Sequence, residues 1–303
     1  MIRLAVRVRR EQAELVLAEL LELAPAGFEE TELDVDVVEF AVYGAPGELP
    51  SLPDLRAVAG GALVEISTSE VADDWQERWK SFHRPVLVPA PGAGPPAPGT
   101  GSRAEVPSLY VRPPWEAPSA PRDRHVREIV IDPGQAFGTG GHASTRLCLG
   151  LLLELAAAEA QRGALLDVGT GSGVLAIAGA LLGFGPVLGL DNELESVHAA
   201  RENAAVNSVE IEVSRFDLRA QPLPRPGVPA EPAAGLVVTA NLLRPLLLEL
   251  AASMESAPAH LIAGGLLAHE ADEIADAFAS SLSLLECERR QSGEWAALWL
   301  ARA

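Results

Sequence analysis

Hydrophobic and polar residues alternate over short stretches in the first 70 residues of the chain, a two-residue period typical of half-buried strands. Between these stretches, apolar residues recur at three- and four-residue intervals, as on one face of a helix. The pattern predicts strands at 2–8, 31–39, 40–44 and 62–68, and helices at 11–23 and 52–59. The resulting β-α-β-β-α-β order indicates a small ferredoxin-like α+β domain over residues 1–70.

The chain beyond residue 105 has a different pattern, in which short continuous apolar runs alternate with longer segments of helical spacing. This alternation is typical of a Rossmann-like α/β domain, whose parallel strands are covered by helices. We expect one such domain over 105–303. Its predicted strands are 109–115, 127–132, 165–168, 186–190, 210–216, 236–240, 260–267, 282–289 and 295–300, and its predicted helices are 146–160, 174–182, 193–206, 245–254 and 271–278.

Two segments connect these parts. Residues 71–88 are predicted as a helical linker, because Trp75, Trp79 and Phe82 lie on one helical face and would pack the two domains together. Residues 89–104 are rich in proline and glycine, which predicts a flexible surface insertion.

A glycine-rich turn follows the first central strand of the larger part. Gly169, Gly171 and Gly173 come directly after the apolar run 165–168 and directly before the helix 174–182. Glycine has no Cβ to keep a ligand away, and the first amides of a helix have no partner within the helix. The turn is therefore a candidate site for a nucleotide-like cofactor, although such a turn can also serve only to pack a helix on a strand.

The spacing of the glycines separates two classes of cofactor. Dinucleotide-binding enzymes place them as G-x-G-x-x-G, and here the third position of that pattern is Val174. The G-x-G-x-G spacing instead resembles the S-adenosylmethionine site of Rossmann-like methyltransferases. Asp191, at the end of the next strand, is placed to accept hydrogen bonds from the ribose hydroxyls of an adenosine. An NAD-linked oxidoreductase stays as an alternative.

Two further stretches carry candidate site residues. The loop 133–142 has four glycines that would let backbone fold over a ligand, and we expect Ser144 or Thr145 to cap the helix that follows. His142 fits an ordinary turn residue. Asn241 places a polar side chain at the carboxyl end of a buried strand, the edge where ligands bind in such sheets.

Composition narrows the class of partner. A formal net charge of -19 and a pI near 4.7 argue against an extended nucleic-acid grip and suit a basic partner. Cys148 and Cys287 lack metal-ligand spacing, so we expect no metal site and two reduced core cysteines. No apolar segment reaches membrane-spanning length, and we expect a cytoplasmic protein.

These motifs together resemble the bacterial PrmA family, the methyltransferases of large-subunit ribosomal protein eleven. The resemblance rests on the glycine turn, Asp191 and five further stretches. Those stretches are Trp75 to Trp79, Val111 to Trp115, the Ala-Phe-Gly-Thr-Gly-x-His loop at 136–142, Ala240-Asn241-Leu242, and Gly293-Glu294-Trp295. It implies a seven-stranded class I methyltransferase domain with S-adenosyl-L-methionine as cofactor. The chain departs from the usual family pattern at Arg244 and at His269.

The resemblance also implies which residues hold the cofactor and what is methylated. Thr145, Gly169, Asp191 and Asn241 are its implied cofactor contacts. To these we add Gly171 and Gly173 from the turn, and Phe137 and Thr139 from the loop. Asn241 is also the candidate for positioning the amine that accepts the methyl group.

The implied substrates are lysine side-chain and N-terminal amines of ribosomal protein eleven, recognised by the N-terminal domain. We expect a monomer without direct nucleic-acid or membrane contact. Alternatives are methylation of another protein or of a small-molecule amine, and a catalytically inactive ribosomal-protein binder. Methyltransferases of glutamine or adenine typically have Asn-Pro-Pro-Tyr where this chain has Asn-Leu-Leu-Arg at 241–244, which favours an amine acceptor.

Overall fold

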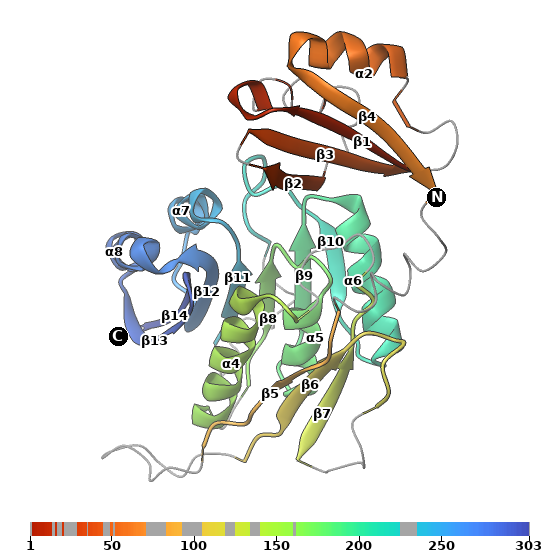
Figure 1. The fold of residues 1–303 in the computed structure, drawn as a ribbon. Coiled ribbons are helices and arrows are strands. Elements are labelled where there is room, and N and C mark those ends of the chain that lie inside the picture. The colour runs from red at the N-terminus through yellow and green to blue at the C-terminus, as the bar shows by residue number, and fades with distance from the viewer. Residues whose placement is uncertain are drawn as a thin grey trace. The chain divides into compact units, whose positions relative to one another are not determined.

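The computed structural model of the chain divides into two compact units, 1–82 and 83–303 (Figure 1). The residues that it describes are 2–13, 16, 20, 29–34, 36–44, 49–50, 52–70, 83–92, 105–118, 125–133, 140–159, 162–224 and 235–302. The predicted helix 11–23 falls largely outside them, and the tryptophan-bearing stretch 71–82 falls outside them completely. Among the described residues, no helix is both long and apolar enough to span a bilayer.

The first unit is an antiparallel sheet with helix α2 (Leu52–Ala59) on one face (Figure 1). Its strands are β1 (Ile2–Arg9), β2 (Glu29–Asp34), β3 (Val37–Gly44) and β4 (Leu63–Glu70), in the order β2-β3-β1-β4. Alternation sends Leu4, Val6 and Phe40 to the core face, where they are buried with Leu55 of α2. On the other face, Glu39 is buried and ion-paired to two arginines, Arg3 and Arg7.

The predicted break between residues 39 and 40 is wrong, because 37–44 form one uninterrupted strand. The chain turns instead near Asp36, whose carbonyl accepts a hydrogen bond from the backbone amide of Arg10 (2.9 Å). Val35 and Val37 flank Asp36 and continue the alternating pattern, so the sequence gives no signal of the turn.

The second unit is built on a seven-stranded sheet of order β10-β9-β8-β11-β12-β14-β13. The strands β8 to β12 are parallel to their neighbours within that group, and β14 runs antiparallel to both β12 and β13. This confirms the predicted α/β class. The strands are β8 (Leu165–Val168), β9 (Val187–Asp191), β10 (Glu212–Arg215), β11 (Val237–Asn241), β12 (His260–Leu267), β13 (Leu284–Ser292) and β14 (Trp295–Arg302).

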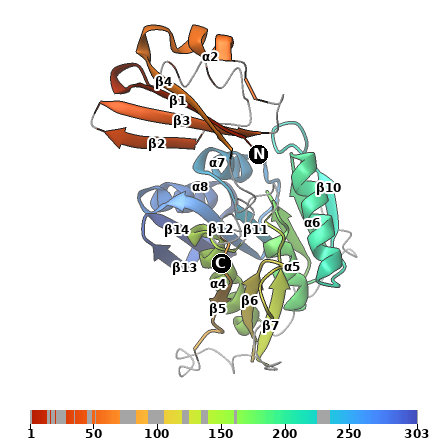
Figure 2. The same ribbon diagram turned by 45° about the vertical axis from the view of Figure 1, so that its right-hand side comes forward.

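Helices cover both faces of this sheet (Figure 2). They are α4 (Ala143–Ala158), α5 (Val174–Leu181), α6 (Leu194–Val206), α7 (Arg244–Ser253) and α8 (Ala271–Leu282). Consecutive residues of β8 face opposite sides, so Leu165 joins the core beneath α4 and α5, while Leu166 joins the core beneath α7 and α8. Both are at most 2% exposed. Burial on two faces explains why these strands are continuously apolar.

A smaller sheet completes the unit and corrects the predicted helical linker. Residues 86–88, inside the predicted 71–88 helix, form strand β5 (Val86–Val88), which pairs with β6 (Ser108–Arg112). Pro85 favours extended backbone at the residue that precedes it, and Val86 and Val88 favour a strand. β6 also pairs in parallel with β7 (Val126–Val130), so the two strands predicted there are confirmed.

Cys148 is buried as predicted, but Cys287 is exposed. Cys287 lies on β13, at the edge of the sheet, where the pairing with β14 shifts register between Glu286 and Glu288. A bulge on an edge strand releases its residue from the alternation that would turn it to the core.

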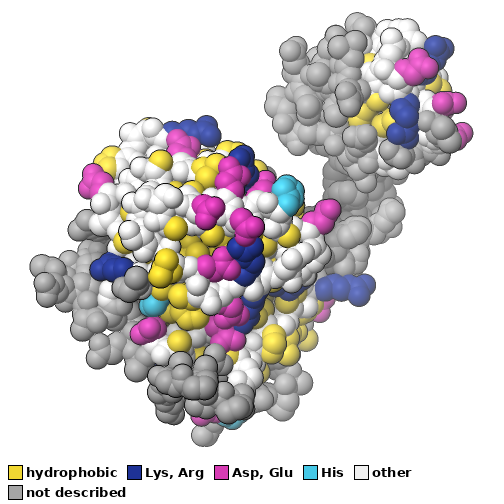
Figure 3. All heavy atoms as spheres, turned by 90° about the vertical axis from the view of Figure 1, so that its left-hand side faces the viewer, with side chains coloured by type: hydrophobic (Ala, Val, Ile, Leu, Met, Phe, Trp, Pro, Cys, Tyr) yellow, Lys and Arg dark blue, Asp and Glu magenta, His cyan; other side chains and the backbone are white. Residues whose placement is uncertain are grey.

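Ion pairs connect the outer elements of the second unit, and Figure 3 shows acidic, basic and hydrophobic side chains interspersed over one of its faces. Arg244, one of the departures from the family pattern, begins α7 and donates from Nε to Glu273 of α8 (2.6 Å). It is absent from the lining of both cavities described below. Arg244 therefore stabilises the contact between α7 and α8 and takes no part in lining the two cavities.

Candidate active site

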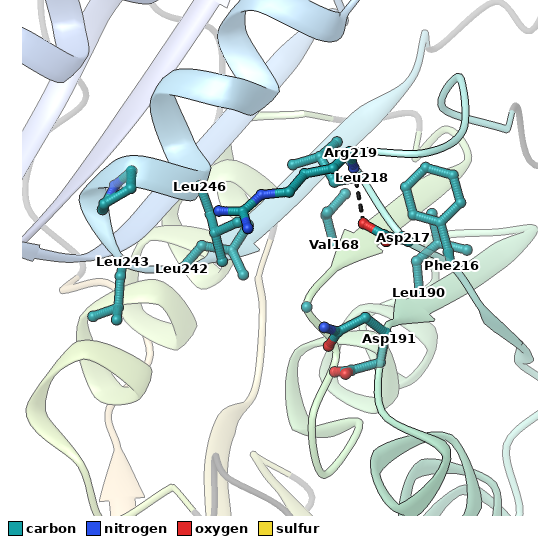
Figure 4. A pocket seen from close by; sticks show the side chains of 13 residues that line it. Val168, Leu190, Asp191, Phe216, Asp217, Leu218, Arg219, Leu242, Leu243 and Leu246 are labelled. Atoms are coloured by element: carbon teal, nitrogen blue, oxygen red, sulfur yellow. Dashed lines mark hydrogen bonds between the residues drawn. The ribbon is translucent and has the colours of Figure 1, made fainter. Parts of the chain in front are cut away.

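Two cavities open at the carboxyl ends of the parallel strands, the edge at which such sheets bind ligands. The larger, of about 500 Å³, extends from the glycine turn after β8 to Trp295 on β14. The smaller, of about 410 Å³, lies between the end of β9 and the start of α7 (Figure 4). Gly169, Asp191 and Leu242 line both, so the two cavities are neighbouring parts of one cleft.

The glycine turn adopts a backbone that side chains disfavour. Gly169, Gly171 and Gly173 have φ values of +73°, +51° and +84°, in the left-handed region. Gly169 and Gly171 line the larger cavity. Gly173 lines neither cavity and packs on α6, where an added Cβ would lie 3.1 Å from the Cβ of Ala200. The first two predicted glycine contacts therefore face the cavity, and the third serves close packing of the turn.

Asp191 reaches across to this turn from the end of β9. Its Oδ2 accepts a hydrogen bond from the backbone amide of Gly171 (2.8 Å), and its Oδ1 accepts one from Glu193 (3.1 Å). A carboxylate offers about four lone-pair positions, so each oxygen keeps one for a ligand. The same contacts that fix Asp191 leave it able to receive two hydroxyl groups.

A buried carboxylate, Asp167, supports the turn from below and was not singled out by the sequence. It is 1% exposed and accepts hydrogen bonds from the hydroxyls of Thr170 and Thr239 (both 2.7 Å). Burial raises the pKa of Asp167 to about 6, although these two hydroxyls oppose the shift. The network ties the turn to β8 and β11.

Asn241 ends β11 beside the first turn of α4. Its Nδ2 donates to the hydroxyl of Thr145 (3.3 Å), and Thr145 is fully buried and does not itself line the cavities. The Oδ1 atom of Asn241 is buried and has no hydrogen-bond partner among the described residues. Buried acceptors without a partner are rare in folded proteins, and Asn241 is one of the residues that line the larger cavity.

The residue after Asn241 fits tightly between two glycines. The Leu242 side chain contacts Gly169, and a Cβ on Gly265 would lie 2.6 Å from the Leu242 carbonyl oxygen. Leu243 and Leu246 extend this apolar wall, and Leu243 is 63% exposed at the cleft. An aliphatic chain entering the cleft would therefore meet leucine side chains.

His142 lines the larger cavity and caps α4, a role that the sequence did not indicate. The helix begins at Ala143, so neither Ser144 nor Thr145 caps it; the Nδ1 of His142 accepts from the backbone amide of Ser144 (3.3 Å). The ring packs edge-on against Trp295, with 4.7 Å between centroids. Burial, together with Arg146, lowers the pKa of His142 and favours the neutral ring that can accept this hydrogen bond. Ser144 and Thr145 are residue types that commonly cap helices, so the sequence favoured them over His142.

The smaller cavity is lined beyond Asp191 by Phe216, Asp217 and Leu218 (Figure 4). The Asp217 carboxylate accepts a hydrogen bond from the backbone amide of Arg219 (2.9 Å). This contact is sufficient to explain Asp217 as a residue of the turn after β10. The apolar neighbours give a flat ring a surface on which to pack.

Phe137 and Thr139 lie outside the described residues. Within the described part of the chain, no group of three or more His, Cys, Asp or Glu residues is arranged to hold a metal ion.

Known proteins resemble this chain over most of its length. A family model described as ribosomal protein L11 methyltransferase (PrmA) matches residues 104–303. The ribosomal protein L11 methyltransferase of Heliobacterium modesticaldum is 37% identical over 76% of this chain, a match that spans 65% of that relative's length. The corresponding protein of Myxococcus xanthus is 32% identical over 99% of this chain and 98% of its own length.

A solved structure agrees with these sequence matches. The crystal structure of ribosomal protein L11 methylase from Lactobacillus delbrueckii subsp. bulgaricus superposes with a TM-score of 0.52 at 30% sequence identity. It covers 64% of this chain and 94% of the solved chain.

Proposed function

Because this chain belongs to the ribosomal protein L11 methyltransferase (PrmA) family, we propose that it transfers methyl groups from S-adenosyl-L-methionine to lysine side-chain and N-terminal amines of ribosomal protein eleven. The observation that carries the proposal is the Oδ1 of Asn241, a buried acceptor that has no partner among the described residues and belongs to a residue lining the larger cavity. A neutral amine has an N–H to donate to such an atom.

The cleft fits the cofactor in three respects. The lone pairs that Asp191 keeps beyond its two backbone contacts suit the two hydroxyls of a ribose, and Gly169 and Gly171 line the larger cavity, where the polar amino-acid end would lie. Phe216 and Leu218 offer the neighbouring apolar space for a purine ring. The two cavities share Asp191, as expected if a nucleoside spans them with its ribose at the boundary.

When bound, S-adenosylmethionine supplies a methyl group activated by a positively charged sulfur, so no side-chain nucleophile is needed. The residues of the chain hold and align the acceptor. The apolar wall of Leu242, Leu243 and Leu246 packs on the aliphatic part of a lysine and excludes water. Desolvation disfavours the ammonium form, which lowers the pKa of the amine and favours its neutral, nucleophilic state. Asn241 then orients that amine through its Oδ1.

The finer features of the fold support the same proposal. The strand order of the large sheet, with its one antiparallel insertion, is what we expect of a class I methyltransferase domain. The β2-β3-β1-β4 order of the first unit agrees with a ferredoxin-like domain, which we assign to substrate recognition. We further propose a monomer that binds neither nucleic acid nor membrane and acts in the cytoplasm, where ribosomal proteins are made.

Incubation of the purified chain with methyl-labelled S-adenosylmethionine and purified ribosomal protein eleven tests the proposal. We expect label in the ribosomal protein, and mass mapping should place it on lysine and N-terminal nitrogens. A substrate whose amines have been acetylated is the control and should stay unlabelled. If the native protein also stays unlabelled while the chain binds the cofactor, the proposal is wrong and an inactive ribosomal-protein binder becomes the better account.

A further inference from the structure

Asn203 lies on α6, outside the linings of the two cavities, and is 3% exposed. Its Nδ2 donates to the carbonyl oxygen of Ser172 in the glycine turn (2.9 Å). Its Oδ1 accepts from the backbone amide of Asp132 (3.0 Å), just after strand β7. One side chain thus joins three segments: helix α6, the turn, and the end of β7.

The position of Ser172 affects both of its neighbours in the turn. The residue before it, Gly171, donates its backbone amide to Oδ2 of Asp191. The residue after it, Gly173, packs on Ala200, which precedes Asn203 by three positions on the same helical face. A displacement of Ser172 would therefore be transmitted through Gly171 to the carboxylate that we assign to the ribose.

We propose that Asn203 is a positioning residue for the cofactor site, which sets the place of Gly171 and Asp191 through the Ser172 carbonyl. The inference rests on the proposed function, because it assigns the turn and Asp191 to S-adenosylmethionine. A merely structural asparagine would contribute to stability and leave cofactor affinity unchanged.

The chain provides a matched control one helical turn away. Asn207 also holds β7, since its Oδ1 accepts from the amide of Val130 (2.8 Å) and its Nδ2 donates to the Val130 carbonyl (2.7 Å). Its Nδ2 also donates to the backbone carbonyl of Asn203 (2.7 Å), and none of these three contacts is made to the glycine turn. Asn207→Ala should therefore lower the melting temperature without weakening cofactor binding.

The most specific test is Asn203→Asp, measured by calorimetric titration with S-adenosylmethionine. The ionised carboxylate keeps an acceptor for the Asp132 amide but faces the Ser172 carbonyl with a second acceptor. A protonated carboxyl restores a donor to that carbonyl, and burial favours protonation. At about pH 8 we expect Kd to rise at least about tenfold relative to wild type, and at about pH 6 the ratio should narrow to about threefold.

Asn203→Ala provides the second measurement and should raise Kd about tenfold at both pH values, while Asn207→Ala stays within about twofold of wild type. A ratio for Asn203→Asp that does not change with pH, or equal losses of affinity in the two alanine variants, would overturn the proposal. If Asn203→Asp does not fold, the alanine pair alone decides. Wild-type binding is measured first, because its absence would contradict the proposed function itself, whereas normal wild-type binding with unaffected variants contradicts only the role of Asn203.

Discussion

The two walls of the larger cavity satisfy their polar groups in opposite ways. On the turn side, Asp191 accepts two backbone amides and Asp167 accepts two threonine hydroxyls. On the β11 side, Asn241 makes one long hydrogen bond to Thr145 and leaves its Oδ1 buried without a partner among the described residues. The turn wall is held by its own contacts, whereas the β11 wall is incomplete until a donor enters.

This difference suggests a division of labour. A wall fixed by internal hydrogen bonds keeps its shape before a ligand arrives, which favours binding of a cofactor. A wall with an unpaired acceptor gains most when a donor is correctly placed, which favours alignment of the reacting amine. Changes to the turn wall should thus alter affinity and stability, and changes to the β11 wall should alter turnover.

The largest expected effect is that of Asp191→Ala. It removes both acceptor positions available to a ribose and the anchor of the Gly171 amide. Hydrogen bonds to a charged group contribute about 1.5–3 kcal/mol each, so calorimetric titration should show Kd for S-adenosylmethionine raised at least about a hundredfold. Asp191→Asn keeps the shape and one acceptor and should lose about tenfold. A Kd for Asp191→Ala within about twofold of wild type would remove this residue from the cofactor site.

A smaller effect, on stability, is expected for Asp167→Asn. Because the folded state holds the pKa of Asp167 at about 6, above its ordinary value, the folded state binds a proton in the window between those values and the unfolded state does not. Wild type therefore gains stability from this group as pH falls through 6 and loses it as pH rises.

The variant lacks this titration. Its free energy of unfolding minus that of wild type should rise by up to about 3 kcal/mol between about pH 4 and about pH 7, measured by urea denaturation. Parallel stability profiles for the two proteins would show that Asp167 is not titrating beneath the turn.

The smallest expected effect belongs to the β11 wall. Thr145→Val keeps the side-chain shape but removes the acceptor of the Asn241 Nδ2, which frees that side chain to turn. With a bond of 3.3 Å at stake, we expect kcat to fall about fivefold and Kd for the cofactor to change little. Thr145→Ser keeps the hydroxyl and serves as the control. Loss of cofactor affinity without loss of kcat would contradict the division between the walls.

Periodicity predicted the elements whose environment is uniform along their length. Strand β12 and helix α2 were predicted with the bounds that the structure shows. It failed at β5, where Pro85 and two valines favour extended backbone and pairing with β6 completes the strand, and at Cys287, whose exposure depends on an edge-strand bulge. The pairing of β5 with β6 and the bulge between β13 and β14 are not visible in the local sequence.

The site residues also differ in whether the local sequence could reveal them. The glycine spacing and Asp191 could be found in the sequence because their chemistry lies in short motifs. Asp167, Asn203 and the contact of His142 with Trp295 could not, because each depends on residues brought together by the fold. That the Asn241 Oδ1 has no partner among the residues that the structure describes is a property of packing and has no signature in the sequence.

In the proposed mechanism, Asn241 aligns the acceptor amine and the turn wall binds the cofactor. Single-turnover methylation of ribosomal protein eleven by Asn241→Ala, with Kd for S-adenosylmethionine measured on the same sample, tests it most directly. We expect the methyl-transfer rate to fall at least about thirtyfold while Kd stays within about threefold of wild type. A variant that retains the full rate, or one whose rate loss is matched by an equal loss of cofactor affinity, would contradict it.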